Sequence, residues 1–281
     1  MPEIFDKNRY IDLCRNSVDY FFKNCIIREL KYPTRVQPKY FGVTPTESQK
    51  SLLDDIRNNS FILVNQSRKV GITTFIQGYT LWLTQLFEGK KVLYHNVTTV
   101  QSIQSLVMLG QLYSLMPSFS RVGVANVAPM YIKFDNKSEV HCYNPGSSKH
   151  DSTKFDLIYV DNATFNKDLY RDLTKLHSML TETGTLVCGS TLYKESPFTY
   201  LCHLAETGGE VPFIYKKFTH IDSKKRDRPY INRLLERLPK DDMLINEYAA
   251  YYTDRNGEIK HITDYLSQDI TLDLPLNIPK L

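Results

Sequence analysis

The chain lacks the features of a membrane or secreted protein. Its longest apolar helical stretch, residues 75–87, is too short to cross a bilayer and contains the polar residues Gln77, Thr80 and Gln85. The N-terminus has no apolar signal region. We therefore expect a protein that works in the cytoplasm and has no membrane partner.

Cysteine and histidine are too scattered to indicate a disulfide framework or a metal site. There is no C-x-x-C pair among the five cysteines, which are Cys14, Cys25, Cys142, Cys188 and Cys202. Three of them lie in apolar patterns, so we expect reduced core residues. The seven histidines show no metal-ligand spacing, and we expect no zinc site.

The composition is that of an ordinary globular protein. The 281 residues are 42% hydrophobic and 23% charged, which suits one large α/β domain or a core with a small appendage. The net charge of +4 is unevenly spread: residues 216–240 hold nine basic and three acidic residues, and residues 241–281 hold three basic and eight acidic ones. The basic segment is either a solvated linker or a surface for a phosphate backbone or a protein partner.

Predicted strands and helices alternate along the chain. Apolar runs predict core strands at 61–65, 92–96, 155–160, 185–188 and 213–218, and a hairpin at 131–143. Helical patterns occupy 10–30, 47–58, 73–87, 100–116 and 167–180, and another follows Pro197. This alternation predicts an α/β fold with a mostly parallel central sheet flanked by helices. Ligands of such sheets bind beyond the carboxyl ends of the strands, where the polar turns 66–74, 161–165 and 189–197 fall.

The turn after the first core strand has the layout of a phosphate-binding loop. In the Walker A pattern, G-x-x-x-x-G-K-[S/T], Gly71 and Thr73 are in place. Gln66 stands where the first glycine belongs, and Ile72 holds the lysine position. By itself the pattern leaves two interpretations open, a variant phosphate loop or an ordinary strand-to-helix turn.

The residues of this turn suit a phosphate and a divalent cation. Backbone N–H groups at a helix N-terminus, together with the helix dipole, favour an anion, and Gly71 lets the backbone approach it closely. Arg68 and Lys69 supply positive charge, and arginine suits bidentate contacts with phosphate oxygens. The Thr73 hydroxyl is a candidate Mg²⁺ ligand.

A second candidate feature lies at the end of the strand 155–160. Asp161 follows directly, in the manner of a Walker B aspartate, and suits Mg²⁺ either directly or through water. ATPases usually place glutamate next, to orient or deprotonate the attacking water. Here that position is Asn162, whose amide orients water but cannot take its proton. The alternative interpretation of Asp161 is a turn aspartate.

Two further features carry little weight alone. Gly189, Ser190 and Thr191 follow the strand 185–188, where small polar residues either sense a γ-phosphate or form a generic turn. Gln49 precedes the loop, after an aromatic segment. Its amide matches the donor–acceptor edge of adenine, and the alternative is an exposed helix residue.

Taken in order, these segments resemble the ATPase domain of the large terminase subunit of tailed bacteriophages, the DNA-packaging motor. The matching segments are residues 16–21 (N-terminal helix), 45–49 (adenine motif), 67–74 (variant phosphate loop), 161–165 (the D-E-A-A-F segment), 189–198 (coupling motif) and 247–252 (an aromatic and acidic motif). The family tolerates a hydrophobic residue at the position of Ile72. The resemblance spans roughly residues 15–260 and depends on the order of its parts.

The resemblance implies a P-loop NTPase fold of the RecA-like (ASCE) class, with ATP and Mg²⁺ as cofactors. The implied nucleotide-binding residues are Gln49, Ser67, Arg68, Lys69, Val70, Gly71, Ile72, Thr73 and Thr74. Arg68 would contact the γ-phosphate, Thr73 and Asp161 would hold Mg²⁺, and Asn162 would stand where water is activated. Gly189, Ser190 and Thr191 would couple hydrolysis to motion.

The resemblance also implies an organisation and partners. Residues 1–218 would form the ATPase core, with residues 1–58 as its helical and adenine-motif segment, and residues 219–281 a lid or linker subdomain. The implied partners are double-stranded DNA, a portal protein and a small terminase subunit, with a homo-oligomeric ring on the portal in the host cytoplasm. No acidic cluster follows residue 260, so we expect no nuclease domain and no DNA cleavage.

Three hypotheses follow from the sequence. The first is an ATPase motor domain that translocates double-stranded DNA into a procapsid, with hydrolysis impaired by Asn162. The second is a hydrolysis-deficient paralogue that acts as a DNA- or partner-binding module. The third is a helicase fragment, which a duplex-unwinding assay distinguishes. An excised domain and a natural short paralogue both stay open.

DNA binding through the basic segment makes a prediction. Replacing Lys224, Lys225 and Arg226 with alanine should flatten the salt dependence of DNA binding, because fewer counterions are released. The slope of log K against log salt concentration should fall by about 0.9 for each phosphate that the variant no longer neutralises. An unchanged slope would identify the segment as a solvated linker.

Overall fold

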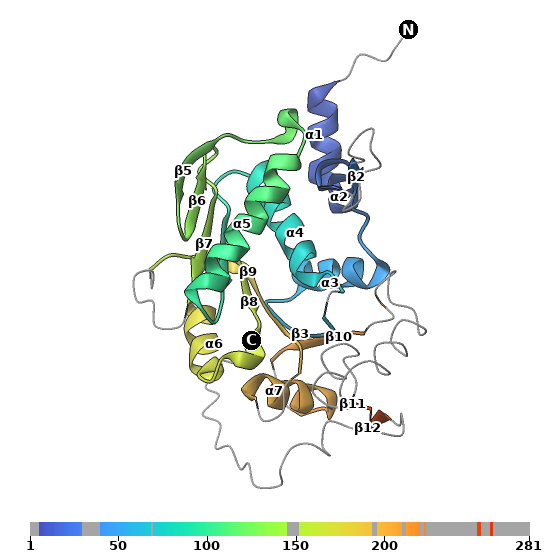
Figure 1. Cartoon of the computed structure of the whole chain (residues 1–281), viewed down its shortest axis with the longest axis vertical. Helices are drawn as coiled ribbons and strands as arrows, with labels where there is room; N and C mark the ends of the chain where they lie inside the picture. Colours follow the sequence, from blue (N-terminus) through green and yellow to red (C-terminus); the bar gives the residue numbers. More distant parts are fainter. Residues whose placement is uncertain are drawn as a thin grey trace.

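The computed structural model describes residues 6–29, 40–68, 70–144, 152–192, 196–209, 212–219 and 222, and two short strands, β11 (Tyr252–Thr253) and β12 (Ile259–Lys260). The strands of its central sheet are β3 (Phe61–Gln66), β4 (Lys91–His95), β5 (Val124–Ala128), β6 (Tyr131–Phe134), β7 (Glu139–Tyr143), β8 (Phe155–Asp161), β9 (Leu180–Ser190) and β10 (Ile214–Phe218). They are ordered β10-β3-β9-β8-β4-β7-β6-β5 (Figure 1). The strands from β10 to β7 pair in parallel, and β6 pairs antiparallel with both β7 and β5.

The helices alternate with these strands. They are α1 (Lys7–Asn16), α2 (Val18–Cys25), α3 (Glu47–Asn58), α4 (Ile72–Leu86), α5 (Thr99–Leu115), α6 (Leu169–Ser178) and α7 (Pro197–Glu206), with 3-10 turns at Ser118–Ser120 and Ala163–Phe165. A separate two-stranded ribbon pairs β1 (Ile27–Glu29) with β2 (Tyr40–Gly42). The predicted α/β fold with a mostly parallel, helix-flanked sheet is confirmed.

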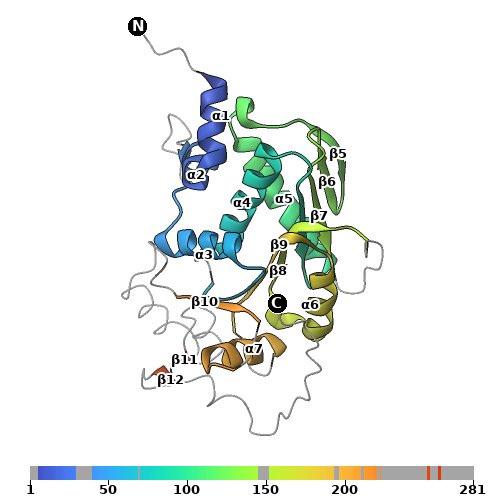
Figure 2. The ribbon, with the colours of Figure 1, turned by 180° about the vertical axis from the view of Figure 1, so that it is seen from behind.

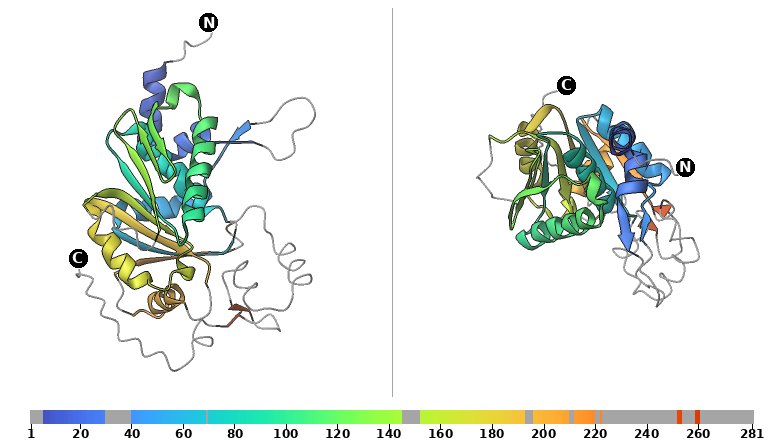
Figure 3. Two further views of the ribbon diagram at one scale, coloured as in Figure 1. Left: turned by 60° about the vertical axis from the view of Figure 1, so that its left-hand side comes forward. Right: turned by 90° about the horizontal axis from the view of Figure 1, so that it is seen from above.

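Each core strand sends alternate side chains into two apolar layers. In β3, Ile62 and Val64 pack in the layer that holds residues of α1 to α5, whereas Phe61 and Leu63 pack against α6 and α7. The sheet is therefore covered on both faces, which is why its strands read as nearly continuous apolar runs. In Figure 3 (left), α5 (green) and α6 (yellow) lie on opposite sides of the sheet, and Figure 2 shows the arrangement from behind.

Two expectations about single elements were wrong, and one strand was not expected. The predicted helix at 10–30 is two helices, because Ser17 adopts extended backbone (φ −139°) and caps α2 by accepting a hydrogen bond from the Tyr20 N–H. The strand β5 was missed: all five of its residues are exposed at the sheet edge, so no apolar alternation marks it. The strand β9 starts at Leu180 rather than residue 185, because its first part is polar.

The five cysteines are all buried and unbridged, as predicted. Within the ranges given above, no helix is long and apolar enough to span a bilayer.

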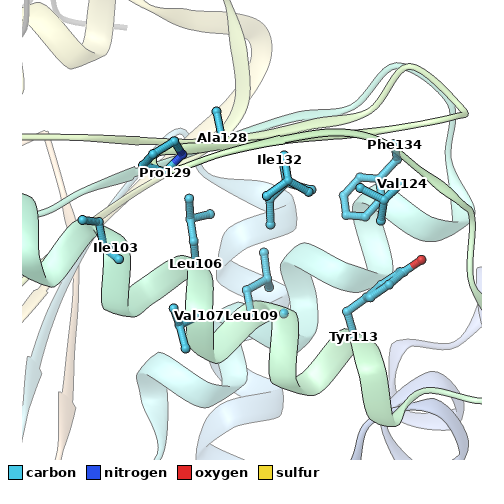
Figure 4. Close-up of a pocket in the computed structure, with 12 residues that line it drawn as sticks. Ile103, Leu106, Val107, Leu109, Tyr113, Val124, Ala128, Pro129, Ile132 and Phe134 are labelled. Atoms are coloured by element: carbon cyan, nitrogen blue, oxygen red, sulfur yellow. The ribbon is translucent and has the colours of Figure 1, made fainter.

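An apolar cavity of about 540 Å³ lies between α5 and the β5–β6 hairpin. Figure 4 shows Leu106 and Tyr113 of the helix facing Ile132 and Phe134 of the hairpin strands. None of the lining residues belongs to the polar turns at the carboxyl edge of the parallel strands. This hollow is thus separate from the edge where a ligand of the sheet is expected.

The N-terminal helices α1 and α2 pack against α4, the helix that follows the turn 66–74. The ring of Phe22 stacks on Phe75 at 5.3 Å between centroids, and the Trp82 indole donates a 2.8 Å hydrogen bond to the Cys14 carbonyl. A methyl group at Gly78 would lie 2.5 Å from the buried Phe22 ring. The absence of a side chain at this position therefore sets how closely α2 approaches α4.

This contact predicts opposite effects for two glycine substitutions in helices. Gly78→Ala should overpack the α2–α4 contact, whereas Gly110→Ala, in α5, meets no atom within 4 Å. Both variants gain the same helix propensity, so their difference in unfolding free energy reports the overpacking, about 1–3 kcal/mol. Urea unfolding measures it. Equal stabilities would mean that α2 moves away from α4 without cost.

Candidate nucleotide-binding site

The three polar turns predicted from the sequence meet at one edge of the sheet. The strand β9 lies between β3 and β8 and pairs in parallel with both. Ser190 is in register with Asn65, and Gly189 with Asp161. The loop after β3, the end of β9 and the end of β8 therefore stand side by side.

The loop 67–71 leads into α4 through Gly71, which has a left-handed backbone conformation. Gly71 has φ +89° and precedes the first helical residue, a backbone conformation that glycine adopts without strain. The Ser67 N–H donates to the Phe218 carbonyl of β10 at 2.8 Å, which fixes the start of the loop. The Ser67 hydroxyl oxygen is buried and has no hydrogen-bond partner among the described residues, which is uncommon for a buried polar atom.

Ile72 does not face the loop interior. Its side chain is 1% exposed and belongs to the apolar layer under α4. A lysine packed there would place an ammonium group in the core, at a cost of several kcal/mol. Positive charge at this loop must therefore come from other residues, and Arg68 is exposed on it. Lys69 lies outside the described residues.

Gln49 is part of the wall behind the loop. It completes a capping box at the start of α3, where its Oε1 accepts from the Thr46 N–H at 3.0 Å. Its Nε2 donates to the Val70 carbonyl at 3.4 Å and would be 3.2 Å from a Cβ at Gly71. This residue thus braces the loop; adenine recognition by Gln49 stays a prediction.

Asp161 has a buried carboxylate that accepts hydrogen bonds through one of its two oxygens. Its Oδ1 accepts hydrogen bonds from the Tyr159 hydroxyl at 3.1 Å and from the Asn162 N–H at 3.0 Å. Burial raises the pKa of Asp161 to about 6, although both hydrogen bonds act to lower it. A cation at this position would relieve the cost of burying the charge.

Asn162 has a left-handed backbone, with φ +58° and ψ +37°. Asparagine tolerates this conformation better than other residues that carry a Cβ. Its carbonyl accepts from the Phe165 N–H and starts the short 3-10 turn. The backbone therefore supplies a local reason for asparagine at the position where the sequence pattern of ATPases led us to expect glutamate.

Ser190 connects the segment after Asn162 to α7. Its hydroxyl accepts from the Thr164 N–H at 3.2 Å, and the Thr164 hydroxyl donates to the Ser196 Oγ at 2.9 Å. Ser196 caps α7 by accepting from the Thr199 N–H. This buried chain of hydrogen bonds links the segment after Asn162 to β9 and to α7.

The site also holds residues that sequence reasoning did not select. Tyr159, Thr164 and Ser196 contact the predicted residues, but the alternation of the strand assigned Tyr159 to the core. The only signal in the sequence was its spacing of two from Asp161, which puts both side chains on one face of β8. The predicted DNA-binding residues Lys224, Lys225 and Arg226 lie outside the described residues.

Comparison with known proteins identifies the fold. No protein-family model matches the sequence, and neither does any curated protein. The large terminase of bacteriophage HK97 superposes with a TM-score of 0.62 at 11% identity, covering 84% of this chain and 54% of that protein. For the large terminase of the thermophilic bacteriophage D6E the TM-score is 0.57 at 13% identity, covering 75% and 54%. The ATPase domain of the Thermus phage P74-26 large terminase gives 0.56 at 12% identity, covering 75% and 94%.

The fold is that of a large-terminase ATPase domain. The chain spans about half the length of the HK97 and D6E proteins and nearly all of the P74-26 ATPase domain. At identities of 11–13% the likeness concerns the fold. The residues of the site have to be argued from their own geometry.

The buried carboxylate predicts a stability change that depends on pH. The folded-state pKa of Asp161, about 6, exceeds its ordinary value of 3.8, so ionisation destabilises the fold as pH rises through this window. The difference corresponds to about 3 kcal/mol at pH 7.5. In metal-free buffer, Asp161→Asn should therefore be more stable than the wild type by about this amount at pH 7.5, and most of the gain should vanish by pH 4.

Urea unfolding at the two pH values measures this effect. Asp156→Asn is a control on the same strand, because Asp156 pairs with Lys90 at 2.7 Å and should lose stability when neutralised. A loss of stability for Asp161→Asn at pH 7.5 would contradict the assignment of a destabilising buried charge.

Proposed function

We propose that this chain is the ATPase domain of a DNA-packaging motor and that it binds ATP with Mg²⁺ at the loop 67–74. One observation carries the proposal: the glycine-turned loop, the buried carboxylate of Asp161 and the hydroxyl of Ser190 stand at the ends of three adjacent parallel strands. The terminase-like fold supports it. The D6E large terminase has itself been solved in complex with ATP-γ-S and with ADP.

The residues at this edge fit a nucleotide with its metal ion. The buried Ser67 hydroxyl, which has no partner in the described part of the chain, suits a phosphate oxygen. Both donors to Asp161 bind its Oδ1, so the other oxygen is available to a Mg²⁺ ion or its water. Thr73, in the first turn of α4, supplies a hydroxyl. The ion, when bound, neutralises charge on the phosphate oxygens during phosphoryl transfer.

Each remaining part has a proposed role. Arg68 approaches the γ-phosphate from the loop, and the backbone amides that open α4 hold the phosphates. Asn162 orients the attacking water without removing its proton. The hydrogen bonds from Thr164 to Ser190 and Ser196 carry the state of the site to β9 and α7. The division into a core (1–218) and a lid or linker (219–281), and the action of a ring on double-stranded DNA, belong to the same proposal.

Slow hydrolysis follows from the asparagine. Phosphoryl transfer depends mainly on positioning and charge stabilisation, so loss of a base lowers turnover and leaves binding intact. If turnover is absent, the same site makes the chain a nucleotide-gated module that binds DNA or a partner. The left-handed backbone at Asn162 favours this second candidate. Asparagine adopts that conformation more readily than glutamate does, so the position suits the backbone rather than a catalytic base.

Two measurements test the proposal. Mg-ATP at 100 times its dissociation constant should stabilise the protein by about 2.7 kcal/mol, seen as a higher melting temperature. Asn162→Glu should raise ATP turnover on the order of 100-fold over Asn162→Gln, because the two side chains match in length and differ in basicity. Both variants carry the same backbone cost, so their melting temperatures serve as the control.

The outcomes separate the candidates. No thermal shift with millimolar Mg-ATP would rule out the nucleotide site. A thermal shift with equal turnover in the Glu and Gln variants would leave the nucleotide site in place and favour the gated module.

A further inference from the structure

One buried tyrosine contacts both Asp161 and the end of β9 in the candidate site. Tyr159 lies on β8 two residues before Asp161, is 0% exposed, and donates its phenolic hydrogen to Asp161 Oδ1 at 3.1 Å. Burial holds the pKa of Tyr159 well above its ordinary value, and the side chains of Thr73 and Gln66, at the two ends of the loop, act to lower it. The hydroxyl thus bonds to the carboxylate of β8, and side chains at both ends of the loop influence its ionisation.

The third neighbouring segment makes room for this phenol. A Cβ at Gly189 would lie 3.3 Å from the Tyr159 hydroxyl oxygen and 3.3 Å from its ring. That is a tight contact against a side chain fully packed in the core. The glycine at the end of β9 is therefore explained by the tyrosine on the neighbouring strand.

The hydrogen bonds also decide which carboxylate oxygen is free to act. The Tyr159 hydroxyl and the Asn162 N–H both donate to Oδ1, and this holds that oxygen in place. The other oxygen has no donor in the described part of the chain and remains for a cation or its water. Hydrogen bonds of this kind orient metal-binding carboxylates, and removing one typically weakens metal affinity by about 10–100-fold.

We propose that Tyr159 is a positioning residue that orients Asp161 and Thr73 for the magnesium ion of a bound nucleotide, with Gln66 acting through it. The inference rests on the proposed nucleotide site. It gives a role to Gln66, which occupies the position of the first glycine in the Walker A pattern. The side-chain amide of Gln66 would stabilise the orientation of the Tyr159 phenol.

The neighbouring strand provides a matched control. Tyr94 is in register with Tyr159, is 1% exposed, and its ring meets that of Tyr159 at 6.0 Å between centroids. Its hydroxyl pairs with Thr80, in the middle of α4, at 2.8 Å. Tyr94→Phe therefore removes an equally buried hydroxyl in the same layer, one whose hydrogen-bond partner is Thr80 and not Asp161.

The experiment compares nucleotide affinity with and without the metal. ADP binding to the full chain is measured by calorimetry in excess Mg²⁺ and in EDTA, for the wild type, Tyr159→Phe, Tyr94→Phe, Gln66→Met and the double variant Gln66→Met/Tyr159→Phe. Tyr159→Phe should reduce the Mg²⁺-dependent gain in affinity on the order of 10-fold and leave the affinity in EDTA unchanged. Tyr94→Phe should alter neither. The double variant should match Tyr159→Phe, because Gln66 acts through the phenol.

Several results would overturn the inference. An unchanged Mg²⁺-dependent gain in Tyr159→Phe would show a purely structural tyrosine, and a larger gain would show that the phenol competes with the ion. Equal losses in Tyr94→Phe would attribute the effect to packing. If Tyr159→Phe does not fold, Gln66→Met carries the test, because Gln66 is only partly buried: an unchanged gain in that variant overturns the proposal. Wild-type protein that binds no ADP in either buffer would overturn the proposed function as well.

Discussion

The parallel insertion of β9 between β3 and β8 is the constraint on which the site depends. Parallel pairing brings the carboxyl ends of the three strands to one edge, so a loop, a carboxylate and a hydroxyl from distant parts of the chain become neighbours. The inserted strand also separates the loop from Asp161 by one strand width. Gly189 has no side chain at this level, and the Tyr159 phenol occupies that space.

The same edge concentrates features that lower stability. A carboxylate is buried with its pKa raised to about 6, a non-glycine residue adopts φ +58°, and the Ser67 hydroxyl is buried without a partner among the described residues. Each has a cost in stability, and the proposed cation and phosphate would relieve the cost of the buried carboxylate and the buried hydroxyl. The apolar layers on the two faces of the sheet, each anchored by several helices, provide the stability that tolerates them.

The distribution of charge around the loop follows from packing. Ile72 belongs to the core that holds α4 against the sheet and the N-terminal helices, so the first residue of this helix serves stability. Arg68 stands on the exposed part of the loop and places a positive charge there. The loop therefore separates two tasks, anchoring the helix and supplying charge, between two residues on either side of Gly71.

The order and type of the core elements could be predicted from the amino-acid sequence, because strands covered on both faces and helices with one apolar face leave strong periodic patterns. The same patterns located Asp161, Asn162 and Ser190 at strand ends and Gly71 in the turn before a helix. Three features emerged from the folded chain alone: the division of the first helix at Ser17, the extension of the sheet by β5, and the contacts of Tyr159 with Asp161 and Gly189. These features depend on a local cap, on the pairing of an edge strand and on the register of neighbouring strands. In the sequence, a tyrosine on a buried strand cannot be told from any other core residue, because its hydroxyl finds its partners only in the folded chain.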